Sequence, residues 1–259
     1  MALPGHVLAT STDEIEGSSA ISTIRCGNTI DGISDRALGP KTLTIEGGLI
    51  ISMAETSAET AVDLDLSEYT CLPGLINTHV HFDANPEDAA DYGVYARRTR
   101  DDNLALILRN AATTVHTGFT TVRHAGAWFP DTLALARAKI DAGTAIGPRI
   151  QSAGPYLTIP GGGGDLIFPE IPTDKVPAES QQGIATTPRQ FAERAKTAIN
   201  KGADFLKVIA SGAVFSTGTE PGAPEMHQDD IEAVVAVAKA HGVKVTAHGH
   251  TAPSGRAAP

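Results

Sequence analysis

A His-x-His pair at the end of an apolar run constrains this chain more than any other feature. Residues 72–83 read Leu-Pro-Gly-Leu-Ile-Asn-Thr-His-Val-His-Phe-Asp, so the run leaves a Pro-Gly turn and ends at His79 and His81. Side chains two residues apart in a β-strand point to the same face. Two imidazoles that converge from one strand can bind a borderline metal ion such as Zn²⁺. The alternative is two histidines on a half-exposed strand, but the turn and the apolar run favour a metal site.

The sequence after this motif alternates between helical periodicity and short apolar runs. Glycine follows each helical pattern, which is typical of helix C-termini. Repeated strand–helix units predict an α/β fold with a parallel sheet. With the His79 strand we count about five strands, where a closed (β/α)8 TIM barrel needs eight, so the expected barrel over residues 71–250 is incomplete. The expected helices are 103–116, 132–141, 187–201 and 229–240, and the further strands are 119–123, 148–154, 204–210 and 243–248.

The remaining segments show weaker patterns. Residues 1–19 are polar and predict a loose leader, whereas 21–27 and 43–51 show short strand patterns broken by glycines, within a β-rich region over 20–70. Residues 55–70 carry five acids and no base, which indicates a connecting segment. Residues 155–187 form a long glycine- and proline-rich loop, either functional or a mobile insertion. Residues 251–259 are expected to be an irregular tail.

Composition limits the classes of partner and compartment. The net charge of −10 argues against a nucleic-acid partner or an anionic membrane surface. Cys26 and Cys71 form no CxxC motif, so neither a disulfide framework nor a cysteine–zinc site is indicated. A reducing, cytoplasmic location is the default expectation. No stretch approaches the apolar length of a membrane span, and a homo-oligomer is left open.

Lys207 lies inside the apolar run Phe-Leu-Lys-Val-Ile-Ala. Burial disfavours its charged form and would make a neutral, nucleophilic amine accessible. Such an amine can react with carbon dioxide to give an anionic carbamate whose two oxygens could bridge two cations. The alternative is a lysine whose head reaches water. His248 and His250 alternate on one face at the end of the following strand pattern.

These motifs together resemble the amidohydrolase superfamily, the metal-dependent hydrolases built on a (β/α)8 barrel. The resemblance rests on the His-x-His strand, on residues 118–123 and 147–150, on the lysine strand at 205–212, and on Ala-His-Gly-His at 247–250. Within the superfamily, the imidazolonepropionase-like and Xaa-Pro-dipeptidase-like branch is most similar. Its members cleave amide bonds in N-acyl amino acids, dipeptides and related lactams and toxins.

The resemblance implies a site with two divalent metal ions, expected to be Zn²⁺. His79, His81, a carboxylated Lys207 and His248 would be ligands, while His250 and Arg123 would contact a small amide substrate. Asp83, which follows the first two ligands in the sequence, would orient one of them without binding the metal itself. The N-terminal strands would belong to a β-sandwich completed by C-terminal strands.

The chain also departs from the family pattern. Asn77 and His124 stand where an aspartate is usual, and Gly163 stands where many members have histidine. We expect the later strands of the family to be missing, as if the chain were truncated after the fifth strand. In the family, those strands supply a further histidine and the aspartate that moves the proton. A catalytically inactive remnant that binds metal weakly, or only associates with other chains, is therefore the alternative function. A single-metal deaminase is a weaker third option, which Lys207 disfavours.

Overall fold

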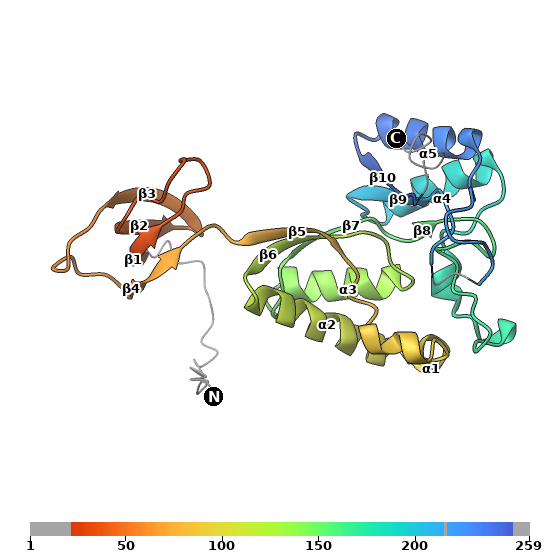
Figure 1. Cartoon of the computed structure of the whole chain (residues 1–259), viewed down its shortest axis with the longest axis horizontal. Helices are drawn as coiled ribbons and strands as arrows, with labels where there is room; N and C mark the ends of the chain where they lie inside the picture. Colours follow the sequence, from red (N-terminus) through yellow and green to blue (C-terminus); the bar gives the residue numbers. More distant parts are fainter. Residues whose placement is uncertain (1–21, 215–216, 251–259) are drawn as a thin grey trace. The chain divides into compact units, whose positions relative to one another are not determined.

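The computed structural model describes residues 22–214 and 217–250. The leader expected at residues 1–19 and the tail expected at 251–259 lie outside these ranges. The chain divides into two compact units, Met1–Pro73 and Gly74–Pro259. Figure 1 shows a small all-β unit and a larger α/β unit.

The first unit is one four-stranded sheet in the order β3-β2-β1-β4. β1 pairs antiparallel with β2 and parallel with β4, and β2 pairs antiparallel with β3. The turn between β2 and β3 contains Gly47 and Gly48, both with positive φ (56° and 77°), a conformation that glycine adopts without steric cost. The strands are β1 (Ser22–Thr29), β2 (Lys41–Glu46), β3 (Leu49–Glu55) and β4 (Leu64–Cys71).

Two sequence expectations about this unit were wrong. The segment 55–70, expected to be only a connection, contains most of β4. Its acidic residues hide the strand pattern, and the backbone pairing with β1 decides its conformation. Cys26 and Cys71 form a disulfide, with their Cα atoms 5.8 Å apart. Spacing could not reveal this bond, because the parallel pairing of β1 with β4 brings together cysteines 45 residues apart. The two cysteines therefore do not indicate a reducing compartment.

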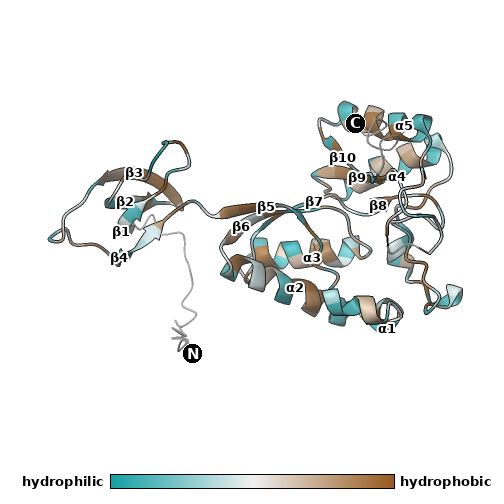
Figure 2. Cartoon of the chain, in the orientation of Figure 1, coloured by the Kyte–Doolittle hydropathy of each residue, from teal (hydrophilic) through white to brown (hydrophobic). Residues whose placement is uncertain are grey.

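Strand β3 leaves apolar side chains in solvent. Every residue of β3 is exposed, and Leu49, Ile50 and Ile51 are 70%, 63% and 54% accessible. Figure 2 shows the hydrophobic colouring of this strand. β3 is also an edge strand, with one row of backbone groups unpaired within the sheet. The first unit therefore has little apolar burial on this side to stabilise it.

The second unit is built from parallel strands, as the sequence predicts. The strands form two three-stranded sheets, in the orders β5-β6-β7 and β10-β9-β8. Helices α2 and α3 contribute to a buried cluster with the first sheet, and α4 and α5 to one with the second. The strands are β5 (Leu75–Val80), β6 (Phe119–His124), β7 (Arg149–Ser152), β8 (Tyr156–Leu157), β9 (Phe205–Ile209) and β10 (Lys244–His248).

The four predicted helices are present. Helix α2 begins three residues earlier than expected because Thr99 caps it: the Thr99 hydroxyl accepts a hydrogen bond from Asp102 N, and the Asp102 carboxylate accepts one from Thr99 N. No helix in the described part of the chain is long and apolar enough to cross a membrane. The helices are α1 (Val94–Arg97), α2 (Arg100–His116), α3 (Pro130–Asp141), α4 (Pro188–Asn200) and α5 (Gln228–Ala240), with a 3-10 turn η1 at Pro86–Ala90.

The long segment 155–187 is more ordered than a plain loop. It contains strand β8 and two 3-10 turns, η2 (Thr173–Lys175) and η3 (Ala178–Gln181). Leu166, Phe168 and Ile171 from this segment are buried in an aromatic cluster. The described strands of the second unit thus number six rather than five. A two-residue strand is too short to leave a periodic signal.

Candidate metal centre

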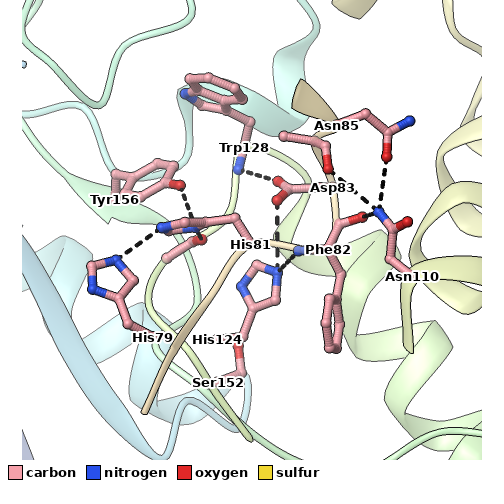
Figure 3. Close-up of polar contacts among 12 residues, drawn as sticks. His79, His81, Phe82, Asp83, Asn85, Asn110, His124, Trp128, Ser152 and Tyr156 are labelled. Carbon is pink, nitrogen blue, oxygen red and sulfur yellow. Dashed lines mark hydrogen bonds and ion pairs between the residues drawn. The ribbon is translucent and has the colours of Figure 1, made fainter. Parts of the chain in front are cut away.

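His79 and His81 lie at the carboxyl end of β5, where parallel α/β folds build their sites. Their Nε2 atoms face each other at 3.1 Å (Figure 3). Two nitrogen ligands on a tetrahedral zinc, each ~2.0–2.1 Å from the ion, lie roughly 3.3 Å apart. The observed separation therefore fits two ligands of one ion. Asn77 supports this geometry, because its side-chain oxygen accepts a hydrogen bond from His79 N at 3.0 Å.

The other ring nitrogen of His81 is held by the surrounding structure. Its Nδ1 lies 3.0 Å from the carbonyl oxygen of Gly126 and 2.9 Å from the hydroxyl of Tyr156. A proton on Nδ1 can be donated to the Gly126 carbonyl, which leaves the Nε2 lone pair free for a metal. Tyr156 could not be predicted from the sequence, because it lies on the two-residue strand β8.

Lys207 occupies the middle of β9, and every residue of that strand is buried. Tyr156 on β8 and Thr246 on β10 are its register partners, so these three side chains share one face of the sheet. His248, two residues after Thr246, shares that face as well. Tyr156 therefore connects the lysine face of one sheet to His81 of the other.

His248 ends β10 with an unsatisfied ring nitrogen. Its Nε2 is buried and has no hydrogen-bond partner among the described residues. A buried polar atom without a partner costs free energy, which a bound cation would remove. The exposed ring of His250 packs edge-on against His248 with centroids 4.4 Å apart, and His250 N donates to Ser211 Oγ at 3.1 Å.

The electrostatics of the site favour neutral bases. Burial is the main cause that lowers the pKa of His79, His81 and His248, reaching about 4 for His248, and positive charge from Lys207 lowers all three further. Burial and then the Arg123 guanidinium lower the pKa of Lys207 to about 8. The site therefore presents imidazole lone pairs and an amine that is easily deprotonated.

Arg123 thus acts electrostatically on two of the expected ligands, His79 and Lys207. The guanidinium carbon of Arg123 lies 4.0 Å from the ring centroid of Phe205, which holds the side chain beside β9. This placement is compatible with an anion-binding role near Lys207.

A second group of ligand-type atoms lies behind His81. His81, Asp83 and His124 each offer an atom within 4.8 Å of the others. The Nε2 of His124 already accepts a hydrogen bond from Phe82 N at 2.8 Å, and Asp83 accepts one from Trp128 N at 2.9 Å (Figure 3). The bond from Phe82 N uses the Nε2 lone pair that His124 would offer a metal, and the bond from Trp128 N occupies part of the Asp83 carboxylate. Asp83 and the fully buried His124 therefore serve better as supports behind His81 than as ligands.

Gly163 has no room for the histidine that the family resemblance leads one to expect at this position. A Cβ at Gly163 would lie 2.9 Å from both N and Cβ of Ala213. The backbone N of Gly163 donates to the buried Glu225 carboxylate at 2.8 Å, and Thr219 Oγ1 donates to it at 2.6 Å. Glu225 therefore ties the glycine-rich loop to the segment after β9.

We expect Glu225→Ala to lower the free energy of unfolding by about 1–3 kcal/mol, because it leaves the buried N–H of Gly163 without an acceptor. Glu220→Ala, at an exposed position in the same segment, is the control and should change stability by less than about 0.5 kcal/mol. Urea denaturation of the two variants and the parent measures the difference. Equal stabilities for the two variants would contradict the predicted role of Glu225 in holding the glycine-rich loop.

The second unit thus has histidines at the carboxyl ends of the parallel strands β5 and β10 and a buried lysine on β9, next to β10. The profile of the Amidohydrolase family matches residues 70–256. The chain belongs to the amidohydrolase family.

Known relatives are consistent with this assignment. Ochratoxinase from Aspergillus niger is 26% identical over 192 residues, which cover 69% of this chain and 39% of the relative. The structure of a Xaa-Pro dipeptidase with methionine in its active site superposes with a TM-score of 0.78 at 28% identity, covering 92% of this chain and 59% of that one. A prolidase complexed with N-methylphosphonate-L-proline gives a TM-score of 0.75 at 26% identity, covering 91% and 57%. The chain thus spans roughly 40–60% of the length of these relatives.

Proposed function

We propose that this chain carries the metal centre of a hydrolase that cleaves carbon–nitrogen bonds of amide or peptide type. The main support is the facing pair of Nε2 atoms on His79 and His81, 3.1 Å apart. The buried, unpartnered Nε2 of His248 gives independent support for a cation nearby. We assign two divalent ions to the site, zinc by ligand type, with His79, His81, Lys207 and His248 as ligands. The fold that would hold them is an incomplete (β/α)8 barrel.

Lys207 would act as a ligand through its carbamate. The ammonium ion first loses one proton to solvent; the neutral amine then adds to carbon dioxide, forming an N–C bond and releasing a second proton, so that an anion replaces a cation. The lowered pKa of Lys207, about 8, makes the neutral amine accessible near neutral pH. The surroundings of Lys207 also favour an anion, because Arg123 nearby is positively charged and the histidines carry no negative charge.

The remaining residues have binding and supporting roles. Ions bound here would supply Lewis-acid chemistry, which lowers the pKa of water and polarises a carbonyl group. Tyr156 and the Gly126 carbonyl hold the His81 ring, while Asp83 and His124 fix the backbone behind it. Arg123 and His250 would contact the substrate.

We propose N-acyl amino acids or dipeptides as the substrate class. The relatives named above include an ochratoxinase and a Xaa-Pro dipeptidase, both at about a quarter identity. An arginine near the ligands would pair with the carboxylate that such substrates carry.

Metal analysis tests the proposed centre. We expect purified chain, reconstituted with zinc and bicarbonate and then freed of loose metal, to hold up to two equivalents. His79→Ala should lower this content by at least one equivalent, because it removes half of the facing pair. His241→Ala, at an exposed helix end, is the matched control and should retain the parent content. Content below one equivalent in the parent, unchanged by His79→Ala, would refute the assignment.

A second candidate is a chain that binds metal or other chains without turnover. Two observations favour it. No carboxylate in residues 22–214 and 217–250 forms a hydrogen bond or ion pair with His79, Lys207 or His248. The apolar side chains of β3 are exposed. Full metal content with no hydrolysis of an N-acyl amino acid, together with self-association, would support this candidate.

A further inference from the structure

An aromatic cavity lies beside His81. It has a volume of about 210 Å³, and His81 and Asp83 form part of its lining. Four aromatic residues line the cavity, and Figure 3 shows two of them, Trp128 and Tyr156, next to His81. The four rings are those of Tyr92, Tyr95, Trp128 and Tyr156.

The walls of this cavity are held firmly in place. Tyr95 and Tyr156 each pack edge-on against Trp128, with centroids 4.8 and 5.9 Å away. The Trp128 indole N–H donates to Gly164 O at 3.0 Å, and its backbone N–H donates to Asp83. The polar atoms of Trp128 are therefore engaged in the protein, and ring carbon faces the cavity.

The size and chemistry of the cavity match a ring. A cavity of roughly 150 Å³ lined by apolar side chains binds benzene, so 210 Å³ accommodates a phenyl group with a methylene attached. Asp83 is the acidic residue of the lining, and its carboxylate already accepts the Trp128 N–H. A negatively charged substituent on a ligand would lose its hydration here beside this carboxylate.

We propose that this cavity receives an aromatic or similarly sized apolar group of the substrate, adjoining the bond that is cleaved. His81 lines the cavity and also faces His79 through Nε2, so a ring seated here adjoins the metal ligands. This inference rests on the proposed function, which supplies the class of substrate. It predicts that amides with an aromatic side chain bind more tightly than amides with a small side chain.

Trp128 provides a direct readout, because it is the chain's single tryptophan. Fluorescence of chelator-treated protein would be followed while N-acetylphenylalanine or N-acetylglycine is added. We expect a saturable change with N-acetylphenylalanine and at least roughly tenfold weaker binding of N-acetylglycine, because a buried ring gains much more than a hydrogen atom.

Two neighbouring alanines supply matched variants. Ala89 lines the cavity, whereas Ala90 does not, and both are exposed residues of η1. Ala89→Phe should weaken N-acetylphenylalanine binding roughly tenfold or more by filling the mouth, whereas Ala90→Phe should bind like the parent. Unchanged far-ultraviolet circular dichroism would show that both variants fold.

The inference is overturned if N-acetylphenylalanine gives no saturable signal, as when another part of the protein occupies the cavity. Equal affinity for the two ligands, or equal binding by the two variants, also overturns it. Ring binding is measured without metal, so its outcome is separate from that of the proposed function. Ring binding with no metal uptake would refute only the metal centre, and metal uptake with no ring binding would refute only this inference.

Discussion

Reduction of the Cys26–Cys71 disulfide is expected to lower the free energy of unfolding of the first unit by about 4 kcal/mol. The bond closes a loop between cysteines 45 residues apart, and the loss of loop entropy in the unfolded chain gives this magnitude. The effect should be decisive here, because β3 leaves its apolar side chains exposed and the sheet has little other stabilisation. Urea denaturation followed by far-ultraviolet circular dichroism, with and without reductant, measures the loss.

Two controls locate this effect. The double variant Cys26→Ala/Cys71→Ala should have the stability of the reduced parent and should not respond to reductant. Trp128 lies in the second unit, so its fluorescence transition should stay in place while the strand signal of the first unit moves. A parent protein whose unfolding is indifferent to reductant would contradict the prediction.

Lys207→Met is expected to stabilise the metal-free chain by up to about 3 kcal/mol at pH 7. The pKa of Lys207 falls from 10.5 to about 8 on folding, so below pH 8 the folded chain carries a buried ammonium ion that is less favourable than in the unfolded chain. Methionine fills a similar volume without this cost. Chemical denaturation in chelator-treated, carbon-dioxide-free buffer measures the gain.

The same shift predicts the pH dependence of stability. Between pH 8 and 10.5 the unfolded chain binds more protons at Lys207 than the folded chain does, so stability rises with pH across this window. Below pH 8 both states are protonated and this residue adds no slope. Lys207→Met should remove the rise, whereas Lys244→Met, at an exposed position of β10, should keep it. An unchanged rise in the Lys207 variant would show that other groups cause it.

The sequence predicted the structural features that depend on local residue patterns. Helices α2, α3, α4 and α5 and the parallel strands follow from apolar periodicity, capping residues and glycines after the helices. The facing geometry of His79 and His81 follows from the period of two in one short segment, and burial of Lys207 follows from its apolar neighbours. These features depend on residues within a few positions of each other.

Contacts between distant segments could be decided only by the tertiary structure. The disulfide joins residues 45 positions apart, and Tyr156 reaches His81 across 75 positions. Glu225 binds the N–H of Gly163 across 62 positions, and His124 accepts the N–H of Phe82 across 42. No local period encodes such pairs, because strand pairing and side-chain packing bring them together. The sequence by itself thus determined which histidines and which lysine each strand carries, and the packing of the two sheets determined which residues hold and surround them.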